Sequence, residues 1–361
     1  MPDSRASWIA LNLIPGIGSD TYRRLLHAFG APDEVYCATL AALEGVVGAP
    51  IARAIRAGVD EAAVRPTLDW LDEDGNHLVT LADADYPRAL LETADPPPLL
   101  YLKGRRALLN APSLAVVGSR NATPQGLRDA EAFAAALSAS GYCVVSGLAL
   151  GIDAAAHRGA LRGAGSTMAV VGTGLDIVYP ARNRDLAHEI AQHGAILSEF
   201  PLGTPSRAGH FPRRNRLISG LSRGVLVVEA AAQSGSLITA RLAGEQGRDV
   251  FAIPGSIHSP LSKGCHQLIR QGAKLVESAN DILEELQGFA PPLPVEAGAP
   301  PDAVPAEYAP LLVHLGHAPL DADTLAERGG LTADAVCAIL LRMELDGLVA
   351  ALPGGLYQRI T

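Results

Sequence analysis

The 361-residue sequence has no apolar run that approaches the roughly 18–20 residues needed to cross a bilayer. Its first residues include Asp3 and Arg5 before a short amphipathic stretch, without the long apolar segment and cleavage pattern of a signal peptide. We therefore expect a cytoplasmic protein with no membrane partner.

Cysteine is scarce, and the sequence has no excess of positive charge. No two of the four cysteines lie at metal-ligand spacing, so we expect reduced, mostly buried thiols and no metal site. The net charge of −9 excludes a broad basic field, so any nucleic-acid partner must be held by a local patch. The cysteines are Cys37, Cys143, Cys265 and Cys337.

Two nucleotide-binding fingerprints are also absent. There is no Walker A sequence, and Gly172-Thr173-Gly174 lacks the third glycine of a dinucleotide-binding loop. The sequence therefore predicts neither NAD nor ATP, and we expect no cofactor.

One stretch does concentrate positive charge. No Asp or Glu occurs from Phe200 to Val228, a window that contains five arginines. Short apolar runs at 195–198 and 225–229 flank it and predict buried strands. Arginine clusters suit phosphate, so we expect this stretch to grip a nucleic-acid backbone, although a solvated basic face is the alternative. The five are Arg207, Arg213, Arg214, Arg216 and Arg223.

From Ser113 to about Leu286 the sequence alternates strand and helix patterns. Near-continuous apolar strands that alternate with helices predict an α/β domain with a Rossmann-like, doubly wound, mostly parallel sheet. The expected strands are 114–117, 142–145, 168–171, 195–198, 225–228 and 250–253.

We divide the chain into residues 1–75, 76–287, 288–306 and 307–361. The first part predicts a helical domain of the SAM or helix–hairpin–helix type, because Gly16-Ile17-Gly18 separates two helical patterns. Such a hairpin binds a phosphate or makes protein contacts, and the sequence favours neither. Residues 76–110 are expected to be a connector with one short strand at 99–102, leading into the Rossmann-like part. Six prolines in 288–306 predict a semi-stiff linker.

The last part predicts three helices followed by a β-hairpin, the order of a winged helix. Thr332 is the expected N-cap of the third helix. Residues 307–361 contain seven Asp or Glu and three Arg, a balance that disfavours duplex DNA. We expect this module to make protein contacts instead.

Small-residue loops after the strands supply the other half of the candidate site. Glycine lets a ligand approach the backbone, and a helix N-terminus offers unpaired amides with partial positive charge. In a parallel sheet these loops gather at one edge, so Arg120 and the arginines of 213–216 are expected to point into one crevice, with Phe211 as a stacking surface for a base. The loops contain Gly118-Ser119-Arg120, Ser146-Gly147, Gly172-Thr173-Gly174 and Ser234-Gly235-Ser236.

Several titratable residues could have either a catalytic or metal-binding role or a structural role. Asp153 and His157 are four apart on a predicted helix, but no third ligand accompanies them, which favours a structural role over a metal or acid–base pair. Glu199 and Glu229 follow strands, and we expect them to hold arginines or helix ends. No catalytic residue is assigned.

A series of motifs resembles the DNA-processing protein A (DprA/Smf) family across about residues 80–286. They are 115–120 (AVVGSR), 146–149 (SGLA) with 151–153 (GID) and His157, 172–176 (GTGLD) with Tyr179, Pro180 and Asn183, 198–201 (SEFP), 211–216 (FPRRNR), 234–237 (SGSL) and 254–256 (PGS). His266 departs from the family pattern, which has Asn after Gly-Cys.

The resemblance implies a cytoplasmic, non-enzymatic protein that binds single-stranded DNA in natural transformation. It would protect incoming strands and promote RecA loading where single-strand-binding protein competes, as a homodimer through the Rossmann-like domain. The DNA-binding residues that the motifs and loops together indicate are Gly118, Ser119, Arg120, Ser146, Gly147, Phe211, Arg213, Arg214, Asn215, Arg216, Ser234, Gly235 and Ser236.

The alternative is a nucleotide-processing enzyme similar to the lysine-decarboxylase-like phosphoribohydrolases. Those enzymes follow their glycine loop with a pair of glutamates. Here the loop at 234–236 leads to Leu237-Ile238-Thr239, and Glu245 is the first acid. The missing acids leave no evident glycosidic chemistry.

Overall fold

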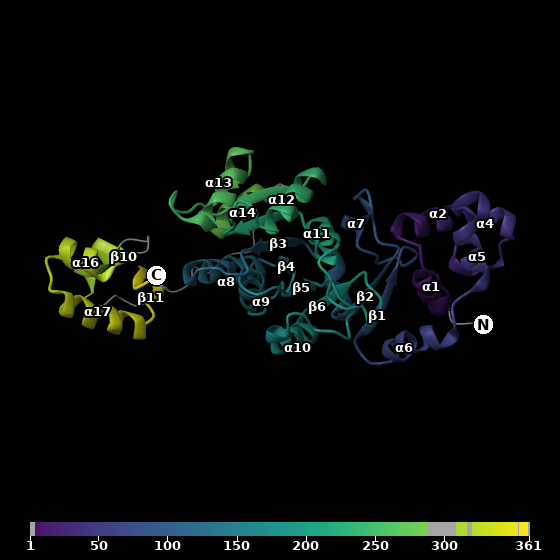
Figure 1. The fold of residues 1–361 in the computed structure, drawn as a ribbon, viewed down its shortest axis with the longest axis horizontal. Coiled ribbons are helices and arrows are strands. Elements are labelled where there is room, and N and C mark those ends of the chain that lie inside the picture. Colours follow the sequence, from purple (N-terminus) through teal and green to yellow (C-terminus); the bar gives the residue numbers. More distant parts are fainter. Residues whose placement is uncertain (1–3, 287–307, 316–319, 353, 360–361) are drawn as a thin grey trace.

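A computed structural model describes residues 4–286, 308–315, 320–352 and 354–359. The predicted linker at 288–306 lies outside the described residues. The described parts form an elongated molecule in which a central sheet domain separates N-terminal helices from a small C-terminal module (Figure 1).

The central sheet has nine strands in the order β1-β2-β6-β5-β4-β3-β7-β8-β9. All neighbours from β6 to β9 are parallel, whereas β2 pairs antiparallel with β6 and β1 antiparallel with β2. The strands are Asn76–Thr80 (β1), Leu99–Gly104 (β2), Ser113–Gly118 (β3), Cys143–Ser146 (β4), Thr167–Val170 (β5), Ala195–Ser198 (β6), Gly224–Val228 (β7), Asp249–Ala252 (β8) and Lys274–Leu275 (β9).

Helices cover both faces of this sheet because successive strand residues point to opposite sides. Ala115 and Val117 of β3 pack in one core with helices α7, α11, α12 and α13, whereas Leu114 and Val116 pack in a second core with α8, α9 and α14. The helices are Arg88–Leu91 (α7), Pro124–Ala139 (α8), Ile152–Ala160 (α9), Arg184–His193 (α10), His210–Leu221 (α11), Ser236–Glu245 (α12), Lys263–Arg270 (α13) and Ala279–Leu286 (α14). Short 3-10 helices span Arg106–Asn110 (η1), Ala181–Asn183 (η2) and Pro260–Ser262 (η3).

The prediction of a Rossmann-like, doubly wound sheet is confirmed, and each of the six expected strands is present. The short strand expected at 99–102 is confirmed as β2, but the interpretation of the rest of 76–110 as a mere connector is wrong. This segment supplies β1 and β2, which extend the parallel sheet by an antiparallel ribbon. The sequence of β1, Asn-His-Leu-Val-Thr, begins with two polar residues and has too few apolar positions to display a strand period.

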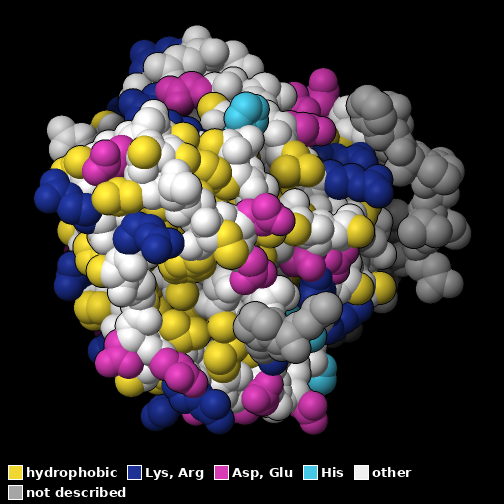
Figure 2. All heavy atoms as spheres, turned by 90° about the vertical axis from the view of Figure 1, so that its right-hand side faces the viewer, with side chains coloured by type: hydrophobic (Ala, Val, Ile, Leu, Met, Phe, Trp, Pro, Cys, Tyr) yellow, Lys and Arg dark blue, Asp and Glu magenta, His cyan; other side chains and the backbone are white. Residues whose placement is uncertain are grey.

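The N-terminal helices pack around Trp8 and Tyr22, whose rings stack with centroids 5.7 Å apart. The Tyr22 hydroxyl donates to the Trp8 carbonyl at 2.9 Å, which ties the first two helices together across the hairpin. The outer face of this region intersperses basic, acidic and apolar side chains and shows no broad basic field (Figure 2). The helices are Ser4–Leu13 (α1), Ser19–Phe29 (α2), Pro32–Cys37 (α3), Leu40–Val47 (α4), Ala49–Ala57 (α5) and Glu61–Leu71 (α6).

The C-terminal module has the predicted winged-helix order. Thr332 caps the third helix, as expected, because its hydroxyl accepts a hydrogen bond from the Ala335 amide at 3.3 Å. The elements are Ala309–Leu315 (α15), Leu320–Asp321 (β10), Ala322–Gly329 (α16), Ala333–Leu345 (α17), Val349–Leu352 (β11) and Leu356–Arg359 (β12).

One glycine at the start of α9 sets the packing of two sheet loops. Gly151 has φ of +76°, and a Cβ there would lie 2.3 Å from the Ser119 carbonyl oxygen. We expect Gly151→Ala to lower the free energy of unfolding by about 2 kcal/mol or more, because backbone strain and overlap add. Urea unfolding followed by circular dichroism measures the change.

Gly244→Ala is the matched control, because Gly244 lies in α12 and a methyl group added there would meet no atom within 4 Å. That substitution should be neutral or stabilising by up to about 1 kcal/mol. Equal stability of the two variants would contradict the packing argument.

Candidate nucleic-acid interface

A groove of about 700 Å³ lies where the strand order reverses, between β3 and β7. Its walls are the loop that follows β3, the loop between β7 and α12, and the first turns of α11. This is the position at which open α/β sheets bind ligands, because two neighbouring loops diverge there.

Nine of the thirteen predicted DNA-binding residues line this groove. They are polar, small or aromatic residues, and they come from the loop after β3, the first turns of α11 and the loop that leads into α12. They are Gly118, Ser119, Arg120, Phe211, Arg214, Asn215, Ser234, Gly235 and Ser236.

The other two arginines of α11 turn away from the groove. A helix places residues three or four apart on one side, so Phe211, Arg214 and Asn215 share the groove side while Arg213 and Arg216 share the next. Arg213 and Arg216 both donate to the Glu199 carboxylate, at 3.1 and 2.5 Å. The expected convergence of all these arginines in one crevice is therefore wrong for Arg213 and Arg216, and their contact with DNA stays a prediction.

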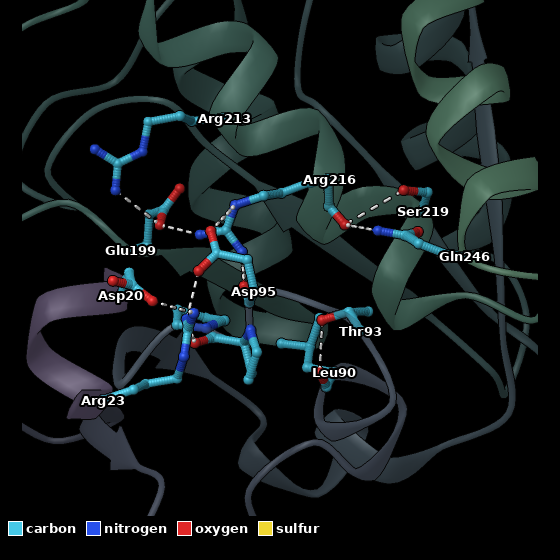
Figure 3. Close-up of polar contacts among 12 residues, drawn as sticks. Asp20, Arg23, Leu90, Thr93, Asp95, Glu199, Arg213, Arg216, Ser219 and Gln246 are labelled. Atoms are coloured by element: carbon cyan, nitrogen blue, oxygen red, sulfur yellow. Dashed lines mark hydrogen bonds and ion pairs between the residues drawn. The ribbon is translucent and has the colours of Figure 1, made fainter. Parts of the chain in front are cut away.

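Arg216 belongs to a charged network that reaches the N-terminal helices (Figure 3). It lies 3.6 Å from the Asp95 carboxylate and also donates to the Asp95 carbonyl. Asp95 in turn binds Arg23 of α2, which donates to the Pro96 carbonyl at 2.9 Å. The Arg216 side chain is 15% exposed and that of Arg213 52%, so Arg213 remains the more accessible to an external phosphate.

Arg214 forms the charged floor of the groove. It is 6% exposed and donates to the Gly147 carbonyl at 2.9 Å. Burial lowers the pKa of its guanidinium to about 10, which leaves the group protonated at neutral pH. The buried Asp153 carboxylate lies in the same region, and its pKa is raised by burial although Arg214 and two backbone amides oppose that shift.

Ser146 and Gly147 lie beneath the groove surface. The Ser146 hydroxyl is buried and donates to the Val116 carbonyl at 2.6 Å. The Gly147 amide donates to Asp153 at 3.1 Å, and its carbonyl accepts from Arg214. A Cβ at residue 147 would lie 1.8 Å from the Arg214 guanidinium, so this glycine makes room for Arg214.

The upper surface combines a cation, an aromatic ring and a loop of small residues. The exposed Arg120 guanidinium lies 5.3 Å from the centroid of the Phe211 ring, and Arg214 lies 5.8 Å from the same centroid. Gly235 precedes α12, whose first amides are already bonded locally. The Ser236 amide donates to the Ser234 hydroxyl at 3.3 Å, and the Leu237 and Ile238 amides donate to the carbonyls of Ser234 and Gly235. A methyl group at Gly235 would meet no atom within 4 Å, so packing does not require glycine there and the position is open to a ligand.

Three residues at or near the groove were missed by the sequence interpretation. Asn121 and Gln233 line it, and Tyr179 lies with its ring centroid 6.0 Å from that of Phe211. The motif around Tyr179 was recognised, but no periodicity indicates that its ring would face Phe211, 32 residues away in sequence.

The acidic residues have the structural roles that the sequence favoured. Glu199 binds arginines, and Glu229 accepts from the amide of Thr123, at 2.8 Å, and from its hydroxyl. Since Thr123 caps α8, Glu229 fixes that helix end. The described residues contain no cluster of three His, Cys, Asp or Glu side chains that could hold a metal ion.

These features define a class of protein: a Rossmann-like fold whose switch-point groove presents arginine, an aromatic ring and the N-terminal end of a helix to an anionic ligand. Family comparison supports this class in detail. The family described as DNA recombination-mediator protein A matches residues 77–287, and the DprA winged helix domain matches residues 295–355.

Individual relatives agree. Protein Smf of Escherichia coli is 45% identical over 304 residues, which cover 82% of this chain and 81% of that protein. The crystal structure of DNA processing protein A from Streptococcus pneumoniae matches with a TM-score of 0.70 and 40% identity, over 78% of this chain and 97% of the other. A Helicobacter pylori structure, described for its single-stranded DNA binding mode, matches with a TM-score of 0.54 and 33% identity, over 59% and 96%. The chain belongs to the DprA/Smf family.

None of the helices in the described ranges is both long enough and apolar enough to cross a membrane.

His157 of α9 is buried, and its protonation state can be tested through the pH dependence of stability. Its Nδ1 lies 2.7 Å from the Thr167 hydroxyl, which itself donates to the Val144 carbonyl, so Nδ1–H is the donor of a neutral imidazole. Burial lowers the pKa of His157 to about 3, below its ordinary value of 6.5. Its contribution to stability is therefore complete above pH 6.5 and is lost as pH falls toward 3, because only the unfolded chain takes up the proton.

We expect the free energy of unfolding to fall by up to about 1.4 kcal/mol per pH unit below pH 6 from this group alone. His157→Asn keeps an amide donor for Thr167 and removes the titration, so its pH slope should be shallower. Urea titrations at pH 7, 6 and 5 give both slopes, and parallel slopes for the two proteins would exclude a neutral buried histidine.

Proposed function

We propose that this protein binds single-stranded DNA in the switch-point groove and acts as a mediator of recombination in natural transformation. It would protect incoming strands and load RecA onto them where single-strand-binding protein competes. It would act in the cytoplasm as a homodimer through the Rossmann-like domain. The observation that supports this best is the groove itself, in which Arg120, Phe211 and the start of α12 face one open space.

The charge distribution explains how an acidic protein holds a polyanion. The net charge of −9 repels nucleic acid at long range, so binding depends on contacts inside the groove. Arg120 supplies a phosphate contact and the positive end of the α12 dipole favours an anion, while Phe211 offers a surface that any base can stack on. Such contacts hold a strand without reading its sequence.

We also infer that the protein is not an enzyme. Among the described residues that line the groove, Asp153 is the one carboxylate, and it already accepts from the amides of Gly147 and Ala149 at 3.1 and 3.3 Å. Glycosidic cleavage by the alternative enzyme class needs two carboxylates that flank the bond. Incubation with nucleoside monophosphates should release no free base, and release that disappears in Asp153→Asn would favour the enzyme.

Arg120→Glu tests the groove directly. We expect it to weaken binding to all single-stranded sequences alike, because Arg120 is exposed and contacts phosphate or sugar rather than base edges. Fluorescence anisotropy at several salt concentrations should give a log–log slope of roughly −2 to −3.5 for the unaltered protein, as for 3–5 neutralised phosphates, and a slope shallower by about 0.7 for the variant.

Arg162→Glu is the matched control. It makes the same charge change, but it follows the C-terminal end of α9 and pairs with Glu131, at the opposite edge of the sheet. Equal losses in the two variants would indicate a general field instead of a groove, and a flat salt titration would rule out backbone binding.

The winged-helix module is expected to contact protein. Its α17 exposes Leu341 and Leu345, on one side of the helix, beside acidic residues. Ending the chain near Pro301 should therefore leave single-strand affinity within a few fold, measured by the same anisotropy titration. A collapse of affinity in a truncated protein that still folds would show that the module takes part in DNA binding.

A further inference from the structure

Tyr179 is an exposed aromatic side chain next to the groove. It is 47% exposed, and it is the single aromatic residue among the large apolar side chains exposed within the described ranges. The chain has only 16 aromatic residues, from 8 Tyr, 6 Phe and 2 Trp. An isolated exposed ring is common on protein surfaces, so the surroundings of Tyr179 must decide whether the ring has a function.

The loop that presents Tyr179 is fixed by hydrogen bonds that other residues make. The Thr173 hydroxyl donates to the Ile177 carbonyl at 2.8 Å, and the Asp176 carboxylate accepts from the Gly203 amide at 2.9 Å. On the other side, the Asn183 side chain donates to the Leu148 carbonyl at 2.9 Å. The hydrogen bonds that hold the loop among the described residues do not involve the Tyr179 hydroxyl, and the ring contacts Phe211.

Tyr179 continues a row of π and cationic groups that starts in the groove. Its ring is tilted by 46° to that of Phe211, whose own surroundings include the Arg120 and Arg214 guanidiniums. The 6.0 Å centroid separation and the tilt leave no parallel slot between the rings. A flat ligand can therefore stack on the outer face of Tyr179, but it cannot be inserted between the two rings.

We propose that Tyr179 is a base-stacking residue that makes this groove prefer unpaired strands over duplexes. This inference rests on the proposed binding of single-stranded DNA and adds the element that selects it. In a duplex both faces of each base are covered by neighbouring bases, so a protein ring gains nothing without unstacking them. In a single strand a base turns outward at low cost, and its stacking on tyrosine is independent of sequence.

Tyr179→Ala separates stacking from charge. We expect a roughly 5- to 150-fold loss of affinity for an oligothymidylate, which corresponds to the usual range for one stacked base. The salt slope should not change, because no cation is removed. The weak affinity for a duplex of the same length should also stay constant, so the ratio of single-strand to duplex affinity falls.

Three controls make the result specific. Tyr179→Phe keeps the ring and should retain affinity, and Leu91→Ala removes another exposed apolar side chain, in α7, and should have no effect. A strand of the same length built from abasic sites should bind the Tyr179→Ala variant and the unaltered protein equally. Thermal unfolding should be unchanged in all variants, because the ring is exposed.

The outcomes distinguish the two proposals. If the unaltered protein fails to bind single strands, the proposed function fails. If it binds them and Tyr179→Ala binds equally well, the function stands and the stacking role is overturned. An equal loss on the abasic strand would indicate backbone contact, and a change in dimerisation without a change in DNA affinity would assign the ring to a protein interface; both results contradict base stacking.

Discussion

The architecture of the groove depends on one buried cation. Arg214 comes from α11, its guanidinium binds the carbonyl at the end of β4, and it lies near the Asp153 carboxylate of α9. A charge in this position is tolerated because a carbonyl and a carboxylate compensate for the water it has lost. The same contact fixes α11 against the loops of the sheet and so determines which side of that helix faces the ligand. Gly147 supplies the space in which this can happen.

The helical period of α11 then places neighbouring residues on different sides of the helix, where they have different roles. Four positions of the Phe211–Arg216 stretch line the groove, and two turn to Glu199. The arginine-rich segment therefore has two functions that its composition does not separate. One face offers charge and an aromatic surface to a ligand, while the other anchors the helix to the end of β6 and, through Asp95, to the N-terminal domain. A count of basic residues in such a segment overestimates the number that remain available.

Much of this arrangement was predictable from sequence. Apolar strands alternating with helical patterns fixed the Rossmann-like core, since buried parallel strands have few other interpretations. Glycine-containing loops after β3 and β7 located the groove because parallel strands end at one edge. Two classes of feature were not predictable. The strand β1 is too short and polar at its start to show a period. Glu199 was expected to bind arginines, but which of the clustered arginines turn to it, and which ring lies beside Tyr179, depends on how α11 is oriented in the fold.

The position of Asp95 has a mechanical consequence. This single carboxylate lies between Arg23 of the N-terminal helices and Arg216 of α11. It therefore links two parts of the described chain that share few other charged contacts. Because α11 carries both groove residues and Arg216, a tilt of this helix would disturb the contacts between Arg216 and Asp95. Apolar packing also joins the two parts, since Leu78, Leu99 and Tyr101 of β1 and β2 share a core with the N-terminal helices. Asp95 therefore adds a directional contact for α11 to an interface that packing already holds together.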